Sequence, residues 1–564
     1  MARSLDFSFR TRAKNLEQLS RDQFDVLVIG GGITGAGIAR DAALRGLRVA
    51  LVERRDFAVG TSSRSSKLIH GGVRYLQQGD VGLVMEAANE RRVLRRLAPH
   101  LARPIHMLVP VHSRPTYAKL SVGLWTFDRM ARVLEDERYR MVNRDETLAL
   151  EPLLRPKDLY GAGLYFEYLT DDARLVLDTL KSAAALGAVV TNYSEVTGLA
   201  KDNGKLSAAM VKDSMTGGEC SVRAKVIVNA AGPWVDAVRL LEGEGETPRL
   251  HLTKGIHLVL RRERLTVSRI VVMNTSDHRA VFVVPHGDVV YIGTTDTDYD
   301  GRYDDPWITA EDVTYLLDAA NATFDVDRLT ESDVVGAWAG LRPLLHQEGK
   351  TPTEISRRDE IMVGPTGMIS IAGGKLTTYR KMAERVVEMA VERLSAGGER
   401  LPERKGDSDS VPLSGGETGD DIEAFVTRLK KRWPQVATDI VDRLVGLYGS
   451  NAERMVEAMV ADPALARRCA ADKAVTRGEV AYAVREEMAM TLQDFLERRA
   501  RLFLWDVDNG LTVAPEAARL MGDLLGWDAR RITAELTNYR RHVREVNTFS
   551  PELEAETTPR VAHG

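Results

Sequence analysis

Short apolar runs separated by glycine turns dominate the first part of the chain. Val26–Ile29 and Val49–Val52 are two such runs, and the segment from Ile38 to Arg45 between them has a helical pattern. A short, continuous apolar run bounded by turn residues is typical of a buried strand. The sequence therefore predicts a strand–helix–strand unit over residues 24–54.

Similar patterns recur farther along the chain. The predicted elements are a helix over residues 82–98, strands over 222–228, 280–284, 289–292 and 368–372, and a helix over 380–392. The two strands on either side of Pro285–Asp288 predict a hairpin, because a Pro-His-Gly-Asp turn joins two apolar runs. The part of the fold that begins with the strand–helix–strand unit therefore continues late in the sequence. A sheet-rich part is inserted between its segments.

The C-terminal portion has a different character. Between Ser395 and Asp421, Gly, Ser, Pro, Asp and Glu are frequent and large apolar residues are few, which is typical of a linker. Beyond it the pattern is helical. One apolar stripe predicts a single buried helix face and consists of Val480, Val484, Met488, Leu492, Phe495, Leu496 and Leu502.

Length and composition narrow the function classes. At 564 residues the chain exceeds what one hydrophobic core usually supports, so two or three domains are expected. The net charge of −4 gives no general reason to expect binding to DNA or RNA. Cys220 and Cys469 form no C-x-x-C pair, so neither a metal site nor a disulfide framework is indicated, and a reducing compartment is the simplest home.

Nothing in the sequence predicts secretion or a membrane span. Residues 1–23 carry charges throughout, lack the apolar core of a signal peptide, and are interpreted as a tail or clasp before the first strand. No uninterrupted apolar stretch of about 18 residues occurs, so any membrane contact would be peripheral.

The turn after the first strand carries the strongest chemical motif, Gly30-x-Gly32-x-x-Gly35. Gly30 allows the tight turn, Gly32 lets the backbone approach a pyrophosphate, and Gly35 lets the helix lie close to the strand. Glu53 ends the second strand, where it can accept hydrogen bonds from ribose hydroxyls and would repel a 2′-phosphate. This arrangement predicts dinucleotide binding, disfavours NADP and leaves FAD and NAD open.

A second run, Thr61–Leu76, resembles the FAD-dependent glycerol-3-phosphate dehydrogenase family. The resemblance extends over positions 24 to about 390, with further motifs at Leu169–Leu177, Val228–Asp236, Lys254–His257, Ile292–Asp296, Ala339–Leu344 and Ala372–Arg380. It fits the C-terminal portion more loosely. The resemblance implies a D-amino-acid-oxidase-like flavoprotein with non-covalent FAD that oxidises sn-glycerol 3-phosphate and passes electrons to membrane quinone.

The fold class implied is α/β + α: a Rossmann-like FAD-binding domain interleaved with a mixed β-sheet substrate domain, plus a C-terminal helical domain. The expected divisions are a tail over 1–23, FAD-binding parts over 24–80, 160–235 and 355–394, substrate parts over 81–159 and 236–354, a linker over 395–421 and a helical domain over 422–564.

Candidate cofactor residues lie in five segments, at residues 30–35, 53, 61–71, 232 and 374–377. The Ser-rich run offers short donors and small residues that let a loop approach the flavin, and the turn at Gly232 resembles a second FAD-contacting turn. The full candidate set is Gly30, Gly32, Thr34, Gly35, Glu53, Thr61, Ser62, Ser63, Ser66, Lys67, His70, Gly71, Gly232, Gly374, Lys375, Leu376 and Thr377.

Substrate recognition is expected to involve arginine. A phosphate brings roughly two negative charges, and the planar guanidinium donates two parallel hydrogen bonds to it. By resemblance, Arg342 lies in the substrate site, and Arg74 with the neighbouring Tyr75 is a second candidate. Lys375 follows a glycine pair before a helix and is expected to stabilise either the reduced flavin or the substrate oxyanion, unless it is a solvated lysine at a helix start.

A base must accept the proton of the alcohol. His257 is the candidate, because imidazole has an ordinary pKa near 6.5 and accepts a proton at neutral pH without a large shift. A core histidine bonded to a backbone carbonyl is an equal alternative. His70 is a rival, although its place beside the flavin-binding turn favours a cofactor contact.

The resemblance also implies a location and partners: cytoplasmic, peripheral on the inner face of the cytoplasmic membrane, with anionic lipid, quinone and a second copy of the chain as candidate partners. Two basic amphipathic stretches, Arg91–Leu101 and Leu496–Trp505, are candidates for lipid contact, although a solvated helix face is the favoured interpretation of either one alone. The alternatives left open are an oxidase that uses oxygen, an amine or 2-hydroxy-acid oxidoreductase of the same fold, and a non-catalytic flavoprotein.

Overall fold

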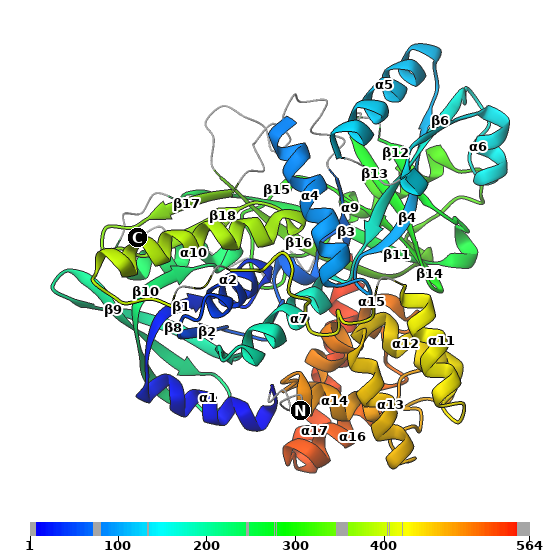
Figure 1. Ribbon diagram of the computed structural model, residues 1–564. Coiled ribbons are helices and arrows are strands. Elements are labelled where there is room, and N and C mark those ends of the chain that lie inside the picture. The colour runs from blue at the N-terminus through cyan, green and yellow to red at the C-terminus, as the bar shows by residue number, and fades with distance from the viewer. Residues whose placement is uncertain are drawn as a thin grey trace.

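The computed structural model describes residues 7–71, 81–131, 133, 135–243, 248–275, 277, 279–345, 359–402, 404, 406–419 and 421–549. Two sheets and a block of C-terminal helices make up this part of the chain (Figure 1). The candidates Arg74 and Tyr75 lie outside the described residues.

The first sheet contains the predicted strand–helix–strand unit. Its eight strands in the described chain are β17 (Asp359–Val363), β18 (Ile369–Gly373), β10 (Glu219–Asn229), β1 (Gln23–Ile29), β2 (Val49–Val52) and β7 (Val189–Thr191) in spatial order, with β9 (Lys205–Asp213) and β8 (Ser194–Asp202) extending from β10. β1 pairs in parallel with β2 and β10, and β10 pairs in parallel with β18. The carboxyl ends of these four strands therefore meet at one edge.

Alternate residues of β1 face opposite layers of packing. Val26 and Val28 face α2 (Ile33–Leu44), α7 (Asp172–Ala185) and α10 (Tyr379–Ala396), which form one helical layer. Leu27 and Ile29 face the other side, where α8 (Val235–Glu242) packs. This burial on both faces explains why β1 has a continuous apolar run.

The N-terminal segment, from residue 7 on, forms a helix that packs on the first sheet, so of the two expectations, a tail or a clasp, it agrees with the clasp. α1 (Phe9–Arg21) is capped by Ser8 and packs Leu16 and Leu19 on the outer layer of the first sheet. Arg12 is buried and pairs with Asp213 at 2.5 Å. Charged residues outnumber apolar ones in this segment, so the sequence pattern concealed a helix that buries only a narrow face.

The second sheet confirms the predicted hairpin. Its strands in the described chain are β15 (Thr297–Asp298), β11 (Leu250–Arg261), β14 (Val289–Gly293), β13 (Ala280–His286), β12 (Ile270–Asn274), β4 (Arg103–Val111), β6 (Gly161–Leu169) and β3 (Leu68–Ile69) in order, with β16 (Val334–Leu345) on β11 and β5 (Arg140–Asn143) on β6. β13 and β14 are antiparallel neighbours. β6 belongs to this sheet, although the sequence analysis placed residues 160–169 with the FAD-binding part.

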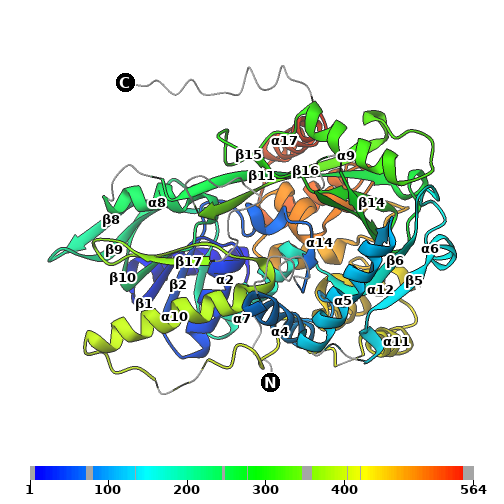
Figure 2. The ribbon, with the colours of Figure 1, turned by 90° about the horizontal axis from the view of Figure 1, so that it is seen from above.

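Four helices accompany the second sheet: α4 (Val81–Leu97), α5 (Arg114–Ala131), α6 (Arg144–Leu150) and α9 (Ala310–Thr323). The turned view separates α4 and α5, beside β6, from α9 on the other side of the sheet (Figure 2). Of the predicted basic stretch in α4, Leu94 and Leu97 lie in the core, and the side chain of Arg91 is 3% exposed and pairs with Glu167. That stretch therefore offers little surface to a lipid.

The C-terminal block is helical as predicted. Its elements are α11 (Ile422–Arg432), α12 (Thr438–Tyr448), α13 (Asn451–Ala461), α14 (Arg477–Glu486), a π-helical turn (Asp494–Arg499), α15 (Leu502–Trp505), α16 (Ala514–Leu525) and α17 (Ala529–Val546). The block packs on the second sheet through a shared apolar core. Among the described residues of 397–421 no helix or strand forms, yet Leu413 is buried and donates its N–H to Leu97.

The apolar stripe of this block is buried, but it does not lie on one helix. Met488 and Arg501 adopt left-handed φ angles of 53° and 59°, which interrupt the helical path. The Asp494 carboxylate accepts the N–H groups of Met490 and Thr491 and begins a new turn. Met488 packs in the core of the first sheet, whereas the other members of the stripe pack in the core shared with the second sheet, so the prediction of a single helix face is wrong.

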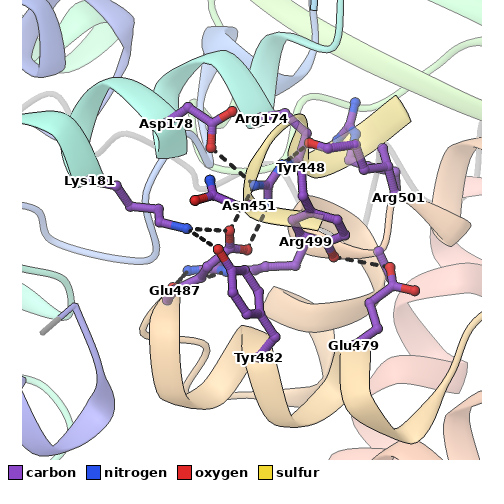
Figure 3. Close-up of polar contacts among 12 residues, drawn as sticks. Arg174, Asp178, Lys181, Tyr448, Asn451, Glu479, Tyr482, Glu487, Arg499 and Arg501 are labelled. Carbon is purple, nitrogen blue, oxygen red and sulfur yellow. Dashed lines mark hydrogen bonds and ion pairs between the residues drawn. The ribbon is translucent and has the colours of Figure 1, made fainter. Parts of the chain in front are cut away.

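Buried charges join the helical block to α7 (Figure 3). The Glu487 carboxylate accepts two hydrogen bonds from Arg174, at 2.6 and 2.7 Å, and one from Lys181 at 3.1 Å. All three side chains are at most 1% exposed. Arg498, Arg499 and Arg501 are buried as well, so the second predicted lipid-binding stretch faces the protein interior. In the described chain, no helix is both long enough and apolar enough to cross a bilayer.

Candidate functional site

A cavity of about 580 Å³ opens where the parallel strands of the first sheet end. Its walls include Gly30 after β1, Glu53 after β2, Gly232 after β10 and Gly374 after β18. Ligands of open α/β sheets bind in the crevice outside the carboxyl ends of the strands, and the volume is in the usual range for a small-molecule site. The cavity is therefore the first candidate for the predicted dinucleotide site.

The glycine turn has the geometry that its spacing predicts. Gly30 has a φ of 113°, and a Cβ there would lie 2.6 Å from the carbonyl oxygen of Ala230. A Cβ on Gly35 would lie 2.0 Å from the carbonyl oxygen of Gly30, so only glycine lets α2 approach the turn this closely. α2 begins after Gly32 with no side-chain cap. A helix start of this kind favours a phosphate, because backbone N–H groups and the helix dipole point toward it.

Glu53 is anchored where β2 ends. Its Oε2 accepts the N–H of Gly31 at 2.6 Å, and its Oε1 accepts the N–H of Arg55 at 2.9 Å. Desolvation raises the pKa of Glu53, while the two backbone N–H groups and Arg54 act in the opposite direction. The carboxylate both braces the glycine turn and lines the cavity where a ribose would lie.

The structure divides the candidate cofactor residues into two sets. The residues that line the cavity are Gly30, Gly32, Thr34, Glu53, Thr61, Ser62, Gly232, Gly374, Lys375 and Leu376. The residues outside its lining are Gly35, Ser63, Ser66, Lys67, His70, Gly71 and Thr377. The lining also includes Trp234, Val196 and Pro343, which the sequence analysis did not select. Large apolar groups of this type suit the faces of a flat ring system.

Asp172, the first residue of α7, holds the Ser-rich loop (residues 61–67) in place. Asp172 accepts hydrogen bonds from the N–H and the hydroxyl of Ser65 at 3.1 and 2.7 Å. It also forms an ion pair with the Lys67 ammonium at 3.0 Å. Desolvation lowers the pKa of Lys67 to about 8, against the effect of Asp172. Since the ammonium of Lys67 is engaged there, a cofactor contact by Lys67 would have to involve its backbone.

His257 lies on β11 and is 2% exposed. Its Nε2 is 2.8 Å from the hydroxyl of Ser66, and its ring stacks on Trp338 at 4.6 Å with an interplanar angle of 10°. Among the described residues Nδ1 has no hydrogen-bond partner. Desolvation, then Lys67 and Arg342, lower the pKa of His257 well below 6.5. The imidazole is therefore neutral near pH 7, but the same desolvation and cations disfavour its protonated form, so the expectation of a proton acceptor without a large pKa shift is wrong.

Arg342 lies on β16, on the same face of the second sheet as His257. β11 and β16 pair Thr253 with Arg342, Gly255 with Gly340, and His257 with Trp338, so these side chains share one face. A Cβ on Gly255 would lie 2.2 Å from Arg342 Nη2, and one on Gly340 would lie 2.6 Å from the carbonyl oxygen of Arg64. The glycines make room for the guanidinium and for the Ser-rich loop above it.

Arg342 has three hydrogen-bond partners that its sequence motif does not reveal. Nη1 donates to Asp296 at 2.9 Å, and Nη2 donates to the Thr294 hydroxyl at 2.9 Å and to the Thr295 carbonyl at 3.0 Å. These three residues belong to the Ile292–Asp296 motif, to which no role was assigned from the sequence. Their role became visible only through the register of β11, β14 and β16.

Lys375 lines the cavity at the start of a short 3₁₀ turn, immediately before α10. Pro343, the neighbour of Arg342, lines the same cavity. The cavity thus extends from the nucleotide edge of the first sheet to β16 of the second sheet. Its residues fit FAD: a glycine cradle and helix start for the pyrophosphate, a carboxylate for the ribose and apolar walls beyond.

Two family models match this chain. Residues 25–380 match the FAD dependent oxidoreductase family, and residues 407–532 match the C-terminal domain of alpha-glycerophosphate oxidase. Among curated proteins, the aerobic glycerol-3-phosphate dehydrogenase of Staphylococcus aureus is 39% identical over 538 residues, which cover 94% of this chain and 96% of that relative.

Solved structures agree with these matches. The glycerol-3-phosphate dehydrogenase of Bacillus halodurans complexed with FAD is similar with a TM-score of 0.81 and 36% identity, covering 96% of this chain and 99% of that one. The L-alpha-glycerophosphate oxidase of Mycoplasma pneumoniae shares the fold, with a TM-score of 0.52, 20% identity, and coverage of 68% of this chain and 98% of that one. The chain belongs to the family of FAD-dependent oxidoreductases that includes the aerobic glycerol-3-phosphate dehydrogenases.

Proposed function

We propose that this protein oxidises sn-glycerol 3-phosphate to dihydroxyacetone phosphate and passes the electrons to a membrane quinone. The observation that carries the proposal is the 39% identity to an aerobic glycerol-3-phosphate dehydrogenase. The match covers 94% of this chain and includes the helical block. A neutral buried histidine and an oriented arginine share one face of the second sheet, and Pro343, which follows the arginine, lines the cavity; these two side chains support the proposal.

The residues that line the cavity would hold FAD, and a bound FAD would supply the acceptor for a hydride from the carbon that carries the reacting hydroxyl. His257 takes the hydroxyl proton on its imidazole, which is unprotonated near pH 7. Arg342 binds the phosphate, held in orientation by Asp296 and Thr294. Lys375 places a positive charge at the cavity wall and stabilises developing negative charge there.

The direct test follows the flavin spectrum of the purified holoprotein. Anaerobic addition of glycerol 3-phosphate should bleach the oxidised flavin, and a quinone analogue should restore it faster than air does. An unbleached flavin would contradict the substrate assignment. Bleaching followed by reoxidation in air at the higher rate would support the second candidate, an oxidase, which the match of residues 407–532 to an oxidase domain favours.

Quinone is a lipid, so its use requires contact with a membrane. We propose α5 as that contact. Val122 and Trp125 are 65% and 52% exposed on one face of α5, Lys119 and Arg129 are exposed beside them, and Met85 of α4 is also exposed. An exposed tryptophan among basic residues suits the interface of an anionic bilayer.

Vesicle sedimentation tests this surface. Trp125→Gln should weaken binding to phosphatidylglycerol vesicles, whereas Leu240→Gln, at another exposed apolar position on α8, should not. Equal binding of the Trp125 variant and the unaltered protein would contradict the assignment of α5. Flavin bleaching should be the same in both variants.

A further inference from the structure

The Ser-rich loop beside His257 is tied to the helical block by one buried arginine. Arg501 donates from Nε to Asp171 at 2.7 Å and from Nη2 to Asp172 at 3.2 Å. Its Nη1 donates to the carbonyl of Glu497 at 2.8 Å, within the block itself. The side chain of Arg501 is 1% exposed. A planar guanidinium with three such contacts fixes the position of both aspartates relative to the block.

Asp172 in turn fixes the loop on both sides of Ser66. Its Oδ2 binds the N–H and hydroxyl of Ser65, and both of its oxygens are 3.0 Å from the Lys67 ammonium. The same ammonium donates to the carbonyl of Ser63 at 2.8 Å. The residues that flank Ser66 are therefore both bound to one carboxylate, and that carboxylate is held by Arg501.

Ser66 connects the loop to His257, the candidate base. Its hydroxyl is 2.8 Å from His257 Nε2, and its carbonyl accepts the hydroxyl of Tyr291 at 3.0 Å. A shift of the loop would remove the partner of Nε2 and admit water to the ring. The ring orientation of His257 and its low solvent access thus depend on the loop.

The helical block also makes an aromatic contact with this region. Trp505 lies edge-on to Trp338, with ring centroids 5.9 Å apart and an interplanar angle of 85°. Trp338 stacks on His257. Arg501 and Trp505 are four residues apart in sequence, so one short segment of the block reaches His257 by two separate routes.

We propose that Arg501 is a positioning residue: acting through Asp172 and the Ser65–Lys67 loop, it lets the helical block set the orientation and the solvent exclusion of His257. The effect of Arg501 on catalysis rests on the proposed function of His257, whereas its effect on the position and solvent exposure of the ring does not. The alternative is that Arg501 only holds the block to α7, as Lys181 does through Glu487.

The charges near His257 determine the direction in which its pKa should change if the loop moves. Lys67 of the loop and Arg342 of β16 are the nearby cations, paired with Asp172 and Asp296, and Tyr291 of β14 is the neighbouring titratable ring. Desolvation is the largest cause that lowers the pKa of His257. If the loop loosens, water reaches the imidazole and the pKa rises toward 6.5.

The decisive readout is chemical labelling of His257 by diethyl pyrocarbonate in the FAD-loaded protein, followed peptide by peptide by mass spectrometry between pH 5 and 8. We expect Arg501→Gln to label at His257 at least fivefold faster than the unaltered protein, with a midpoint at higher pH. Ser65→Ala, a milder change that removes the 2.7 Å bond to Asp172, should move both quantities in the same direction.

Lys181→Gln is the matched control, because Lys181 is equally buried and joins the block to α7 well away from the loop. Its labelling rate and midpoint at His257 should equal those of the unaltered protein. Equal labelling in the Arg501 variant, or a matching increase in the Lys181 variant, would overturn the inference and leave Arg501 as a simple interdomain contact.

Flavin bleaching by glycerol 3-phosphate supplies an independent second reading. The acid limb of its rate should move to higher pH in Arg501→Gln and stay in place in Lys181→Gln. If the unaltered protein fails to bleach, the substrate assignment fails, but the labelling experiment still decides the role of Arg501.

Discussion

Asp296 holds one edge of the Arg342 guanidinium at 2.9 Å, on the face of the second sheet that also carries His257. Thr294 binds the other terminal nitrogen at the same distance. The arginine is thereby oriented before any ligand arrives, which reduces the conformational entropy that substrate binding would cost.

Arg342→Lys keeps the charge but loses the planar fork. Because hydrogen bonds to charged groups contribute about 1.5–3 kcal/mol, the KM for glycerol 3-phosphate should rise roughly 10- to 100-fold. FAD content, measured from the absorbance of the purified protein, should not change. Arg328→Lys, at an exposed position, is the control and should leave the KM unaltered. Loss of FAD in the Arg342 variant would place this side chain in the cofactor site instead.

Gly293→Ala should disturb His257 directly. An added Cβ would lie 2.0 Å from the imidazole Cδ2, so the ring or the strand must move, at a cost of about 1–3 kcal/mol for overpacking. We expect a lower Tm and slower flavin bleaching. Gly198→Ala, where the nearest atom would be 3.8 Å away, should change neither. Unchanged bleaching in Gly293→Ala would argue against His257 as the base.

The pH profile of bleaching should reflect the environment of His257. Desolvation, Lys67 and Arg342 lower its pKa well below 6.5, so the ring stays deprotonated as the pH falls from 7 through 6.5. Anaerobic stopped-flow rates should accordingly decline only at lower pH. His257→Gln should slow bleaching about 10²- to 10⁴-fold and abolish this limb. A limb centred at 6.5 in the unaltered protein would contradict the assigned environment.

Glu487→Gln should loosen the contact between α7 and the helical block. Desolvation would raise the pKa of Glu487, but Arg174 and Lys181 outweigh it and bring the pKa to about 2. Because this is below the value of 4.5 in the unfolded chain, the stabilisation is complete above pH 4.5 and is lost as the pH falls toward 2. Removing one partner of a buried pair typically costs about 3–5 kcal/mol.

Thermal unfolding at several pH values provides the measurement. At pH 7 the Glu487 variant should unfold at a lower temperature than the unaltered protein, and the difference should shrink as the pH falls below 4.5. Glu453→Gln, whose partner Arg432 is largely exposed, serves as the control and should lower the Tm little. A difference in Tm that does not depend on pH would show that the ion pair is not its cause.

Local patterns predicted much of the nucleotide region. Gly30, Gly35 and Glu53 act within a span of 24 residues, so spacing along the chain alone specifies their geometry. The hairpin of β13 and β14 is equally local. The elements that were misjudged depend on distant contacts: α1 is stabilised by β10 and β7, and β6 pairs with β4 some 55 residues away.

The candidate site shows the same division. His257 and Arg342 could be selected by residue type and motif, but their shared face follows from the register of β11 with β16. Asp172 and Arg501 meet across 329 positions, and no periodicity reports such a contact. The arginines near position 500 looked like a solvated basic surface in sequence, because a buried ion pair and an exposed charge have the same local pattern.

Arg498, Arg499 and Arg501 extend from the helical block into the nucleotide region, where Asp56, Asp171 and Asp172 receive them. Neither the helical block nor the nucleotide region can be replaced alone by that of a distant relative. The replacement would leave several buried charges of one sign without their partners. The two regions must therefore be inherited, and engineered, as a single piece. A hybrid enzyme would need the three arginines and their aspartates transferred together.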